Sequence, residues 1–381
     1  MIKGYFDNAA TTYKKPDGMY EYISQVMYDC GANVGRGEYD ASKQSGKVVA
    51  DTRKYLLHLT KAPEDRTVVF TPSATIALNT IIFGIDLKDG DVVYVSQFEH
   101  NAVLRPLYAL QEKISIVIKF LPMDKENKYI FDLIRIEQEF LHYKPRLVIV
   151  SHVSNVTGNI APVDAISGIA KKYSAITVID GSQSCGLLAC NMFNVDYYVF
   201  AGHKTLLGPT GIGGFICKKN IKIKPFVYGG TGIDSANHYM PEYLPERFEA
   251  GTLNLMSIVG LNYSLRWIIN NMKFYREREN INVKRVYKIL SNCEFIKITS
   301  PSSNVSGIVS CVFNGYTSDE IGQVLAENGI SVRTGLHCAP KAHEYVGSFP
   351  EGLVRFSVTC FTDEEDFKVL ENVLRKIAIC L

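Results

Sequence analysis

Hydrophobic residues along the chain gather in short continuous runs, and these runs alternate with longer amphipathic segments. A short apolar run bounded by polar residues or glycine is typical of a strand that is buried on both faces. Such runs lie at residues 67–70, 91–96, 146–152, 175–179 and 197–200. Apolar positions at helical spacing occur at residues 42–59, 76–83 and 163–173, and a long helix is expected from about residue 258 to 288. Strands that alternate with helices in this way predict an α/β fold with a mostly parallel sheet.

Length and composition are those of a chain with two domains and a substantial core. The chain has 381 residues, of which 46% are hydrophobic and 21% are charged, as in ordinary globular enzymes. We expect a large domain at residues 16–255. A smaller α+β domain is expected to combine residues 256–381 with an N-terminal arm, residues 1–15.

Charge and cysteine usage exclude several classes of protein. A net charge of +2 indicates neither a nucleic-acid surface nor a membrane surface. The N-terminal residues lack the apolar core of a signal peptide, and no apolar run is long enough to span a bilayer. The nine cysteines are scattered without a Cys-x-x-Cys pair. This pattern argues against a disulfide framework or a zinc site and favours a reducing cytoplasm.

Two residues of opposite charge follow the ends of predicted strands. Asp180 comes directly after the run at 175–179, and Lys204 lies shortly after the run at 197–200. A lysine after a strand is most often an ordinary surface residue. An acid and a lysine at one sheet edge are, however, what pyridoxal phosphate (PLP) requires, because the lysine forms the Schiff base and the acid keeps the pyridine nitrogen protonated. Gln183 is then placed to hydrogen-bond the phenolic oxygen of the ring.

The turn at residues 71–75 joins the run at 67–70 to the helical segment at 76–83. Free backbone N–H groups and the positive end of the helix dipole make such a turn suitable for a phosphate group. The alternative is a plain helix cap, in which Ser73 or Thr75 accepts a hydrogen bond from the backbone. The residues alone leave both interpretations open.

Several motifs in a fixed order make the chain resemble a known family. They are Phe-Asp-Asn-Ala-Ala-Thr-Thr at 6–12, Gly-His-Lys at 202–204, Glu-Ala-Gly-Thr at 249–252, Arg-Thr-Gly-Leu-His-Cys-Ala at 333–339 and Val-Arg-Phe-Ser at 354–357. Over nearly its full length the chain resembles the class V, aminotransferase-type PLP enzymes of the cysteine desulfurase family, which includes the selenocysteine lyases. The resemblance implies the PLP-dependent transferase type I fold.

The resemblance assigns a cofactor role to a set of residues. It implies that His100 stacks on the pyridine ring and shuttles protons. It also implies that Thr252 reaches the phosphate of the neighbouring subunit, in a homodimer with shared active sites. The full cofactor set is Ala74, Thr75, His100, Asn155, Asp180, Gln183, His203, Lys204 and Thr252. Three positions depart from the usual family residues: Ser73 stands in place of Gly, Ala201 in place of Ser and Leu336 in place of His.

The resemblance also assigns residues to catalysis and to substrate binding. Lys204 and His100 are implied as catalytic residues, and Cys338 as the acceptor of the substrate sulfur, because an exposed thiolate near positive charge is a good nucleophile. Contacts to the substrate are implied for Asn155, Arg355 and Asn33. Arg355 lies in an apolar, strand-like run, where its charge needs an anion. The anion is either the substrate α-carboxylate, which the resemblance favours, or an internal salt bridge.

The expected activity is that of a PLP-dependent cysteine desulfurase. L-cysteine becomes L-alanine, and its sulfur is left on Cys338 as a persulfide that a partner protein or a small thiol accepts. One alternative is a selenocysteine lyase, which releases selenium from L-selenocysteine. Another is a class V lyase or transaminase in which Cys338 is idle. A subunit that mainly binds a sulfur acceptor is disfavoured, because Lys204, Asp180, His100 and Arg355 are all present.

Overall fold

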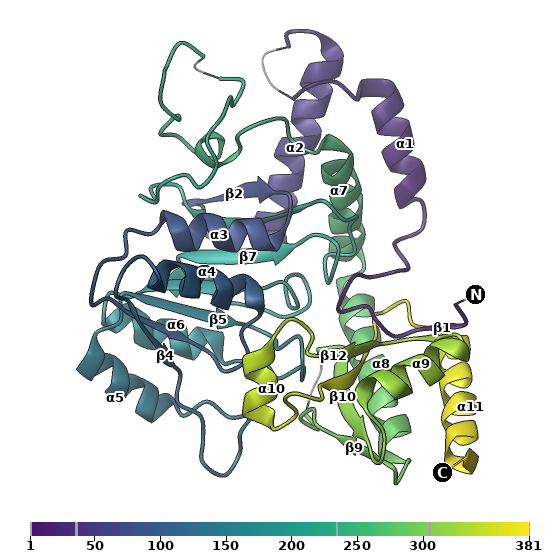
Figure 1. Cartoon of the computed structure of the whole chain (residues 1–381). Helices are drawn as coiled ribbons and strands as arrows, with labels where there is room; N and C mark the ends of the chain where they lie inside the picture. The colour runs from purple at the N-terminus through teal and green to yellow at the C-terminus, as the bar shows by residue number, and fades with distance from the viewer. Residues whose placement is uncertain (1, 35–36, 234, 304–305, 381) are drawn as a thin grey trace.

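The central feature of the structure is a seven-stranded sheet in the larger part of the chain (Figure 1). The computed structural model describes residues 2–34, 37–233, 235–303 and 306–380. Along the sheet the strand order is β2-β8-β7-β6-β5-β3-β4, with β8 antiparallel to its two neighbours and all other neighbours parallel. The strands are β2 (Arg66–Thr71), β3 (Val92–Val95), β4 (Val117–Phe120), β5 (Leu147–Ser151), β6 (Ile176–Asp180), β7 (Tyr197–Ala201) and β8 (Gly213–Lys218). The predicted mostly parallel α/β sheet is confirmed.

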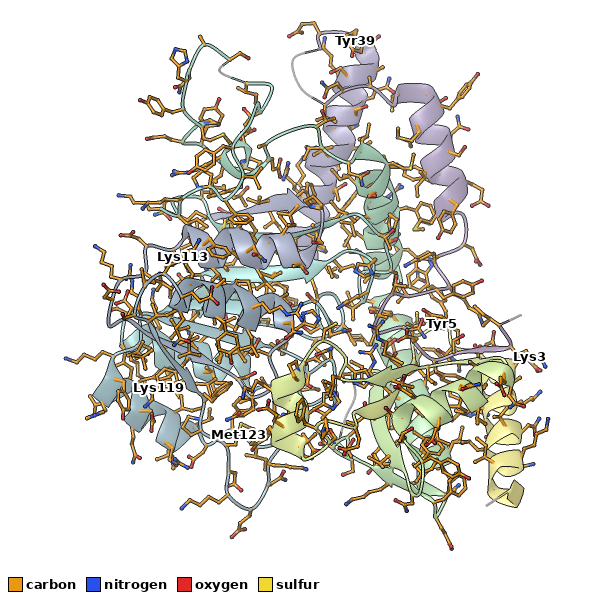
Figure 2. The ribbon with its side chains drawn as sticks, in the orientation of Figure 1. Lys3, Tyr5, Tyr39, Lys113, Lys119 and Met123 are labelled. Carbon is orange, nitrogen blue, oxygen red and sulfur yellow. The ribbon has the colours of Figure 1, made fainter. Side chains whose placement is uncertain are left out.

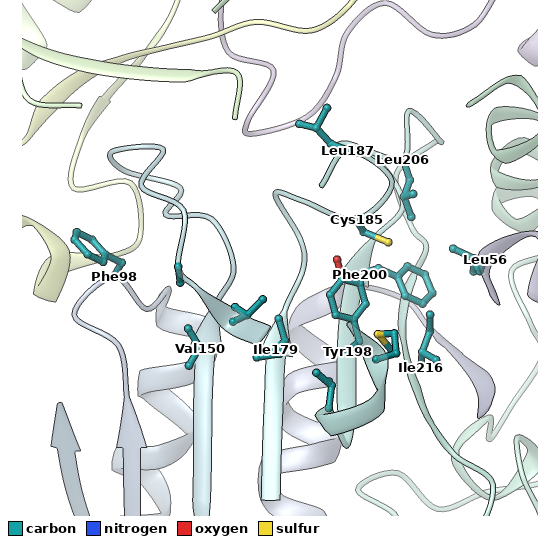
Figure 3. Close-up of a cluster of buried hydrophobic side chains, with 14 of the residues drawn as sticks. Leu56, Phe98, Val150, Ile179, Cys185, Leu187, Tyr198, Phe200, Leu206 and Ile216 are labelled. Atoms are coloured by element: carbon teal, nitrogen blue, oxygen red, sulfur yellow. The ribbon is translucent and has the colours of Figure 1, made fainter. Parts of the chain in front are cut away.

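Helices cover both faces of this sheet, because alternate residues of a strand point to opposite faces. Tyr197 and Val199 of β7 pack with α3 and α4, whereas Tyr198 and Phe200 pack with α2, α5, α6 and α7. Figure 3 shows Tyr198 and Phe200 near Ile179 of the neighbouring strand. The helices are α1 (Met19–Cys30), α2 (Asp40–Leu59), α3 (Ala74–Gly84), α4 (Asn101–Gln111), α5 (Leu133–Tyr143), α6 (Val163–Lys172) and α7 (Leu255–Asn270).

A second, antiparallel sheet forms the smaller part of the molecule, at the lower right of Figure 1. Its strand order is β12-β13-β10-β9, and a separate parallel pair joins β1, near the N-terminus, to β11. The strands are β1 (Gly4–Tyr5), β9 (Ile296–Ile298), β10 (Ile308–Phe313), β11 (Ile330–Ser331), β12 (Arg333–Gly335) and β13 (Leu353–Ser357). The helices are α8 (Met272–Ser291), α9 (Ser318–Glu327), α10 (Pro340–Val346) and α11 (Glu364–Cys380). The N-terminal segment therefore pairs with the C-terminal part of the chain.

The long helix predicted from about residue 258 to 288 is two helices. α7 ends at Asn270 and α8 begins at Met272, because Asn271 between them leaves the helical conformation (φ −121°, ψ 24°). α7 packs against α1 and α2, on the side of the larger sheet. The expected boundary after residue 255 thus falls at the first residue of α7, a helix that packs with the larger part. The division into two domains stays a prediction.

Across the described ranges, each helix is either too short or too polar to cross a membrane. This agrees with the expectation from the sequence, in which no apolar run is long enough for a bilayer.

Candidate active site

A cavity opens at the carboxyl ends of the parallel strands, where α/β sheets commonly bind their ligands. The cavity is small, with a volume of about 50 Å³. The lining residues are Ala74, Thr75, Leu78, His100, Ala102, Ser151, Val153, Asn155, Asp180, Ser182, Gln183 and Lys204. Seven residues singled out in the sequence therefore meet here, from loops and helix starts that follow β2, β3, β5, β6 and β7.

A tight turn after β7 holds Lys204 in this cavity. The Gly208 N–H donates to the Gly202 carbonyl (2.8 Å), and the Leu207 N–H donates to the Lys204 carbonyl (2.9 Å). A Cβ atom on Gly202 would lie 2.6 Å from Cγ2 of Ile212. Only glycine fits at this point of the turn, because a side chain would push β7 away from the segment that leads into β8.

Burial sets the protonation state of the Lys204 amine. Desolvation lowers its pKa to about 8; the carboxylate of Asp180 opposes this effect, and the positive charge of Arg355 adds to it. An amine with this pKa is neutral in a substantial fraction of molecules near pH 8. A neutral amine can act as a nucleophile or as a base, whereas an ordinary ammonium group cannot.

Asp180 presents one carboxylate oxygen to the cavity. Its Oδ1 accepts hydrogen bonds from the backbone N–H (2.9 Å) and the hydroxyl (2.5 Å) of Ser182. Oδ2 accepts no hydrogen bond from any residue that the structure describes, so it is available to a ligand donor. Next to it, Gln183 Nε2 donates to the Ala9 carbonyl (2.8 Å), which ties the cavity lining to the N-terminal segment.

His100 caps α4 with its ring. Nδ1 accepts a hydrogen bond from the Ala102 N–H (3.0 Å), which places the proton of the neutral ring on Nε2. Burial and, to a smaller extent, the charge of Lys204 lower the pKa of His100 to about 4, although Asp180 opposes them. His100 is therefore a neutral hydrogen-bond donor at neutral pH, in one fixed tautomer.

The start of α3 forms another wall of the cavity, and it contains the turn for which the sequence left two interpretations. Ser73 is the N-cap, and its hydroxyl accepts a hydrogen bond from the Ile76 N–H (3.3 Å). The predicted alternative of a helix cap is therefore present at Ser73. Ala74 and Thr75 line the cavity at the same helix start, so the cap does not exclude an anion site at this end.

Four of the predicted cofactor or substrate residues lie outside the cavity lining: His203, Thr252, Asn33 and Arg355, the last of which is described below. His203 adjoins Lys204, and its Nδ1 is buried with no hydrogen-bond partner among the described residues. Thr252 is exposed and lines a separate groove with Phe226 and Ile258. Asn33 is exposed between α1 and α2. Residues 35–36, in the loop after it, lie outside the described residues.

Cys338 stands on a loop between β12 and α10 that reaches the cavity rim. Its carbonyl accepts a hydrogen bond from the Asn101 N–H at the start of α4 (2.7 Å), and Asn155 Nδ2 donates to the His337 carbonyl (2.7 Å). His337 and Cys338 both have left-handed backbone angles (φ 47° and 56°), which is uncommon for residues with side chains. Two hydrogen bonds from the larger part of the molecule thus anchor a loop conformation that is unfavourable by itself.

Cys338 differs from the other cysteines in its exposure. Among the cysteines whose side chains the structure describes, it alone is exposed. Burial raises the pKa of Cys185 and of Cys217 to about 12 and raises that of Cys311 as well, so these thiols stay protonated and unreactive. The contrast singles out Cys338 as the thiol that a ligand in the cavity or a partner protein can reach.

Arg355 occupies the middle of β13 and is almost completely buried. Nη1 donates to the Asn155 carbonyl and Nη2 forms an ion pair with Asp7 Oδ1, each at 2.9 Å. Burial lowers the pKa of Arg355, and Asp7 opposes this effect. The internal salt bridge that the sequence left as an alternative is therefore present. Asp7 was not predicted as its partner, although Asp7 lies in the motif at 6–12.

Comparisons with known proteins agree with this arrangement. The chain is 29% identical, over 98% of its length and 94% of the relative, to a probable cysteine desulfurase of Methanothermobacter thermautotrophicus. It is also 29% identical to a cysteine desulfurase of Synechococcus elongatus, of which it spans 60% of the length. The apo structure of a cysteine desulfurase from Thermococcus onnurineus NA1 superposes with a TM-score of 0.90 at 30% identity, covering 99% of this chain and 95% of that one.

The family match extends over almost the whole chain and includes both sheets. The description of the matching family is aminotransferase class V, and residues 4–370 are matched. This stretch contains Lys204, Asp180, Cys338 and Arg355, together with the strands that carry them. The chain belongs to the class V aminotransferase family.

Proposed function

We propose that the chain is a PLP-dependent cysteine desulfurase, which converts L-cysteine to L-alanine and takes the sulfur onto Cys338. The observation that carries the proposal is the juxtaposition of two reactive groups from different parts of the fold. Lys204 brings a buried amine of lowered pKa into the cavity. The exposed Cys338 stands at its rim, bound through its carbonyl to the start of α4. A lyase or transaminase needs the first group only.

The residues of the cavity fit PLP. Asp180 Oδ2 is free to pair with the ring nitrogen, and the buried Nδ1 of His203 lacks a partner among the described residues, as a group that awaits a phosphate oxygen does. Ala74 and Thr75 would hold the phosphate at the start of α3. Bound there and linked to Lys204, PLP would supply an electron sink that weakens the Cα–H bond of an amino acid.

The proton transfers fall to groups whose protonation states suit them. The neutral fraction of the Lys204 amine takes the Cα proton of the substrate, because a pKa of about 8 keeps this base poised near the working pH. Asp180 would pair with the ring nitrogen and balance a positive charge there. His100 keeps its Nε2 proton as a donor, since its Nδ1 is engaged by Ala102.

Sulfur transfer requires a thiolate at the substrate sulfur. The Cys338 thiolate forms an S–S bond as the Cβ–S bond of the substrate breaks, and the bonding pair of that bond stays with the carbon fragment. Protonation of that fragment at Cβ gives L-alanine, and a persulfide anion remains on Cys338. The substrate thiol loses one proton and Cβ gains one, so the net change converts one thiolate and one L-cysteine into one persulfide anion and one L-alanine, and no external oxidant is needed.

The same proposal covers assembly, partners and location. Thr252 and Asn33 lie outside the cavity lining of their own chain, which suits residues that act in the active site of a second copy, within a homodimer. The exposure of Cys338 leaves its persulfide accessible to a sulfur-acceptor protein. Among the cysteines whose side chains the structure describes, all are free, which suits the cytoplasm. Residues 16–255 form the larger domain of this proposal, and residues 1–15 with 256–381 form the smaller one.

The test compares Cys338→Ser with the wild type, on L-cysteine and on L-selenocysteine. The variant should keep the cofactor absorbance and still bind L-cysteine, but sulfide release in the presence of dithiothreitol should fall to background, because a hydroxyl is a far poorer nucleophile. Cys293→Ser is the matched control and should leave activity unchanged, since Cys293 is partly buried at the end of α8.

Three outcomes decide between the candidate activities. A sulfur adduct on Cys338 in the wild type, seen by intact-mass measurement and absent in the variant, would support the desulfurase. Full sulfide release by Cys338→Ser would rule out the persulfide route. Release of selenium with no activity on L-cysteine in the wild type would assign the chain to the selenocysteine lyases.

A further inference from the structure

The N-terminal segment runs beside β13 and brings Asp7 next to Arg355. The Ser357 N–H donates to the Phe6 carbonyl (2.6 Å), and Asp7 forms a parallel bridge with Ser357. Tyr5, labelled in Figure 2, lies just before this contact, where the segment meets the smaller part of the molecule. Since backbone hydrogen bonds fix the segment, the Asp7 carboxylate has a defined place along β13.

The Arg355 guanidinium has used only part of its donor set. It carries five N–H groups, one on Nε and two on each terminal nitrogen. Nη1 donates to the Asn155 carbonyl and Nη2 to Asp7, both at 2.9 Å. Nε is buried without a hydrogen-bond partner in the described parts of the chain. One N–H therefore remains on each terminal nitrogen, which is the number that a carboxylate accepts in a paired contact.

Asp7 holds the guanidinium from outside the cavity. Asn155 lines the cavity, whereas Asp7 does not. Arg355 is close enough to the cavity for its charge to lower the pKa of Lys204 and of His100. A guanidinium whose side chain is only 3% exposed needs a counter-charge when no substrate is bound, because an unpaired buried charge is strongly unfavourable. Asp7 supplies that charge.

We infer, on the footing of the proposed function, that Asp7 is a positioning residue for the substrate carboxylate. Through Nη2 it fixes the plane of the Arg355 guanidinium, so that the remaining N–H groups stay directed to the substrate. The opposite arrangement is a blocking contact, in which the substrate has to displace Asp7. Removal of Asp7 distinguishes the two arrangements, because loss of a positioning residue weakens substrate binding, whereas loss of a blocking residue strengthens it.

The test uses the PLP-loaded protein and two ligands, L-alanine and ethylamine, of which only the first has a carboxylate. Their affinities are measured by titration of the cofactor absorbance. Asp7→Ala should weaken L-alanine binding by about tenfold or more, the effect of losing a charge-assisted hydrogen bond, and should leave ethylamine binding unchanged. Asp7→Asn keeps an acceptor without the charge and should lie between. With L-cysteine, KM should rise by a larger factor than kcat falls.

Two controls separate positioning from general damage to the arm. Lys14, in the same N-terminal segment, forms an ion pair with Asp363 (Nζ to Oδ2, 2.6 Å), and Asp363→Asn removes the charge of that partner. This variant should bind both ligands as the wild type does. In an Arg355→Ala background, Asp7→Ala should cause no further loss of L-alanine affinity, because Asp7 acts through Arg355.

Each other outcome has a definite meaning. Tighter L-alanine binding in Asp7→Ala would establish the blocking contact and overturn the inference. An equal loss for both ligands would reduce Asp7 to a role in folding. A wild type that binds L-alanine but releases no sulfur from L-cysteine would contradict the proposed function, while the comparison of the two ligands would still decide the role of Asp7.

Discussion

Replacing Lys204 by methionine should stabilise the protein without its cofactor. The amine is fully buried, and desolvation lowers its pKa from an ordinary 10.5 to about 8. This lowering of the pKa by about 2.5 means that burial of the charged amine reduces the free energy of unfolding by roughly 3 kcal/mol. Methionine has a similar length and no charge, so Lys204→Met removes this loss. We therefore expect the free energy of unfolding of the variant to exceed that of the wild type by up to about 3 kcal/mol at pH 7.

The stability difference between Lys204→Met and the wild type should depend on pH. Below pH 8 the Lys204 amine is protonated in both the folded and the unfolded chain, so the whole penalty is present. Between pH 8 and 10.5 only the unfolded chain keeps the proton, and the wild type gains stability as the pH rises. The advantage of Lys204→Met should therefore be largest at pH 7 and should shrink through pH 9 and 10.

The assay is urea unfolding of cofactor-free protein at several pH values, followed by circular dichroism. Lys171→Met is the control, because Lys171 is exposed at the end of α6 and its replacement should change stability little at any pH. A Lys204→Met variant less stable than the wild type at pH 7, or a difference that does not change with pH, would refute the assignment of Lys204 as a buried, destabilised cation.

Two further predictions concern residues that hold the site in place. Asp180→Ala should weaken PLP binding and nearly abolish turnover, because the ring nitrogen loses its anionic partner; a PLP titration and a sulfide assay measure this, and turnover at the wild-type rate would contradict it. Arg53→Met leaves Glu249 buried without the guanidinium that contacts it at 2.7 Å, and should lower the free energy of unfolding by about 3 kcal/mol. Thermal unfolding tests it, and an unchanged melting temperature would show that water replaces Arg53.

Much of the site could be predicted from local sequence patterns. Asp180 and Lys204 follow short apolar runs, and parallel strands bring their carboxyl ends to one edge of a sheet, so the pattern alone predicts that these two side chains meet. The same reasoning places Ala74 in the turn that opens a helix, as the structure has it, and His100 shortly after the end of a strand. These features depend on residues close together in the chain, where periodicity and turn chemistry are informative.

The tertiary structure alone decided how the two parts of the molecule meet. Asp7 pairs with Arg355, which lies 348 residues away in the sequence. The Asn101 N–H donates a hydrogen bond to the carbonyl of Cys338, and the backbone of Cys338 is in the left-handed region. Local sequence spacing predicts neither contact, because each joins residues that are far apart in the sequence and meet only in the folded chain. For the same reason the sequence could not decide whether the anion beside Arg355 belongs to the protein or to a substrate: a buried guanidinium requires a carboxylate, and its chemistry does not distinguish between the two sources.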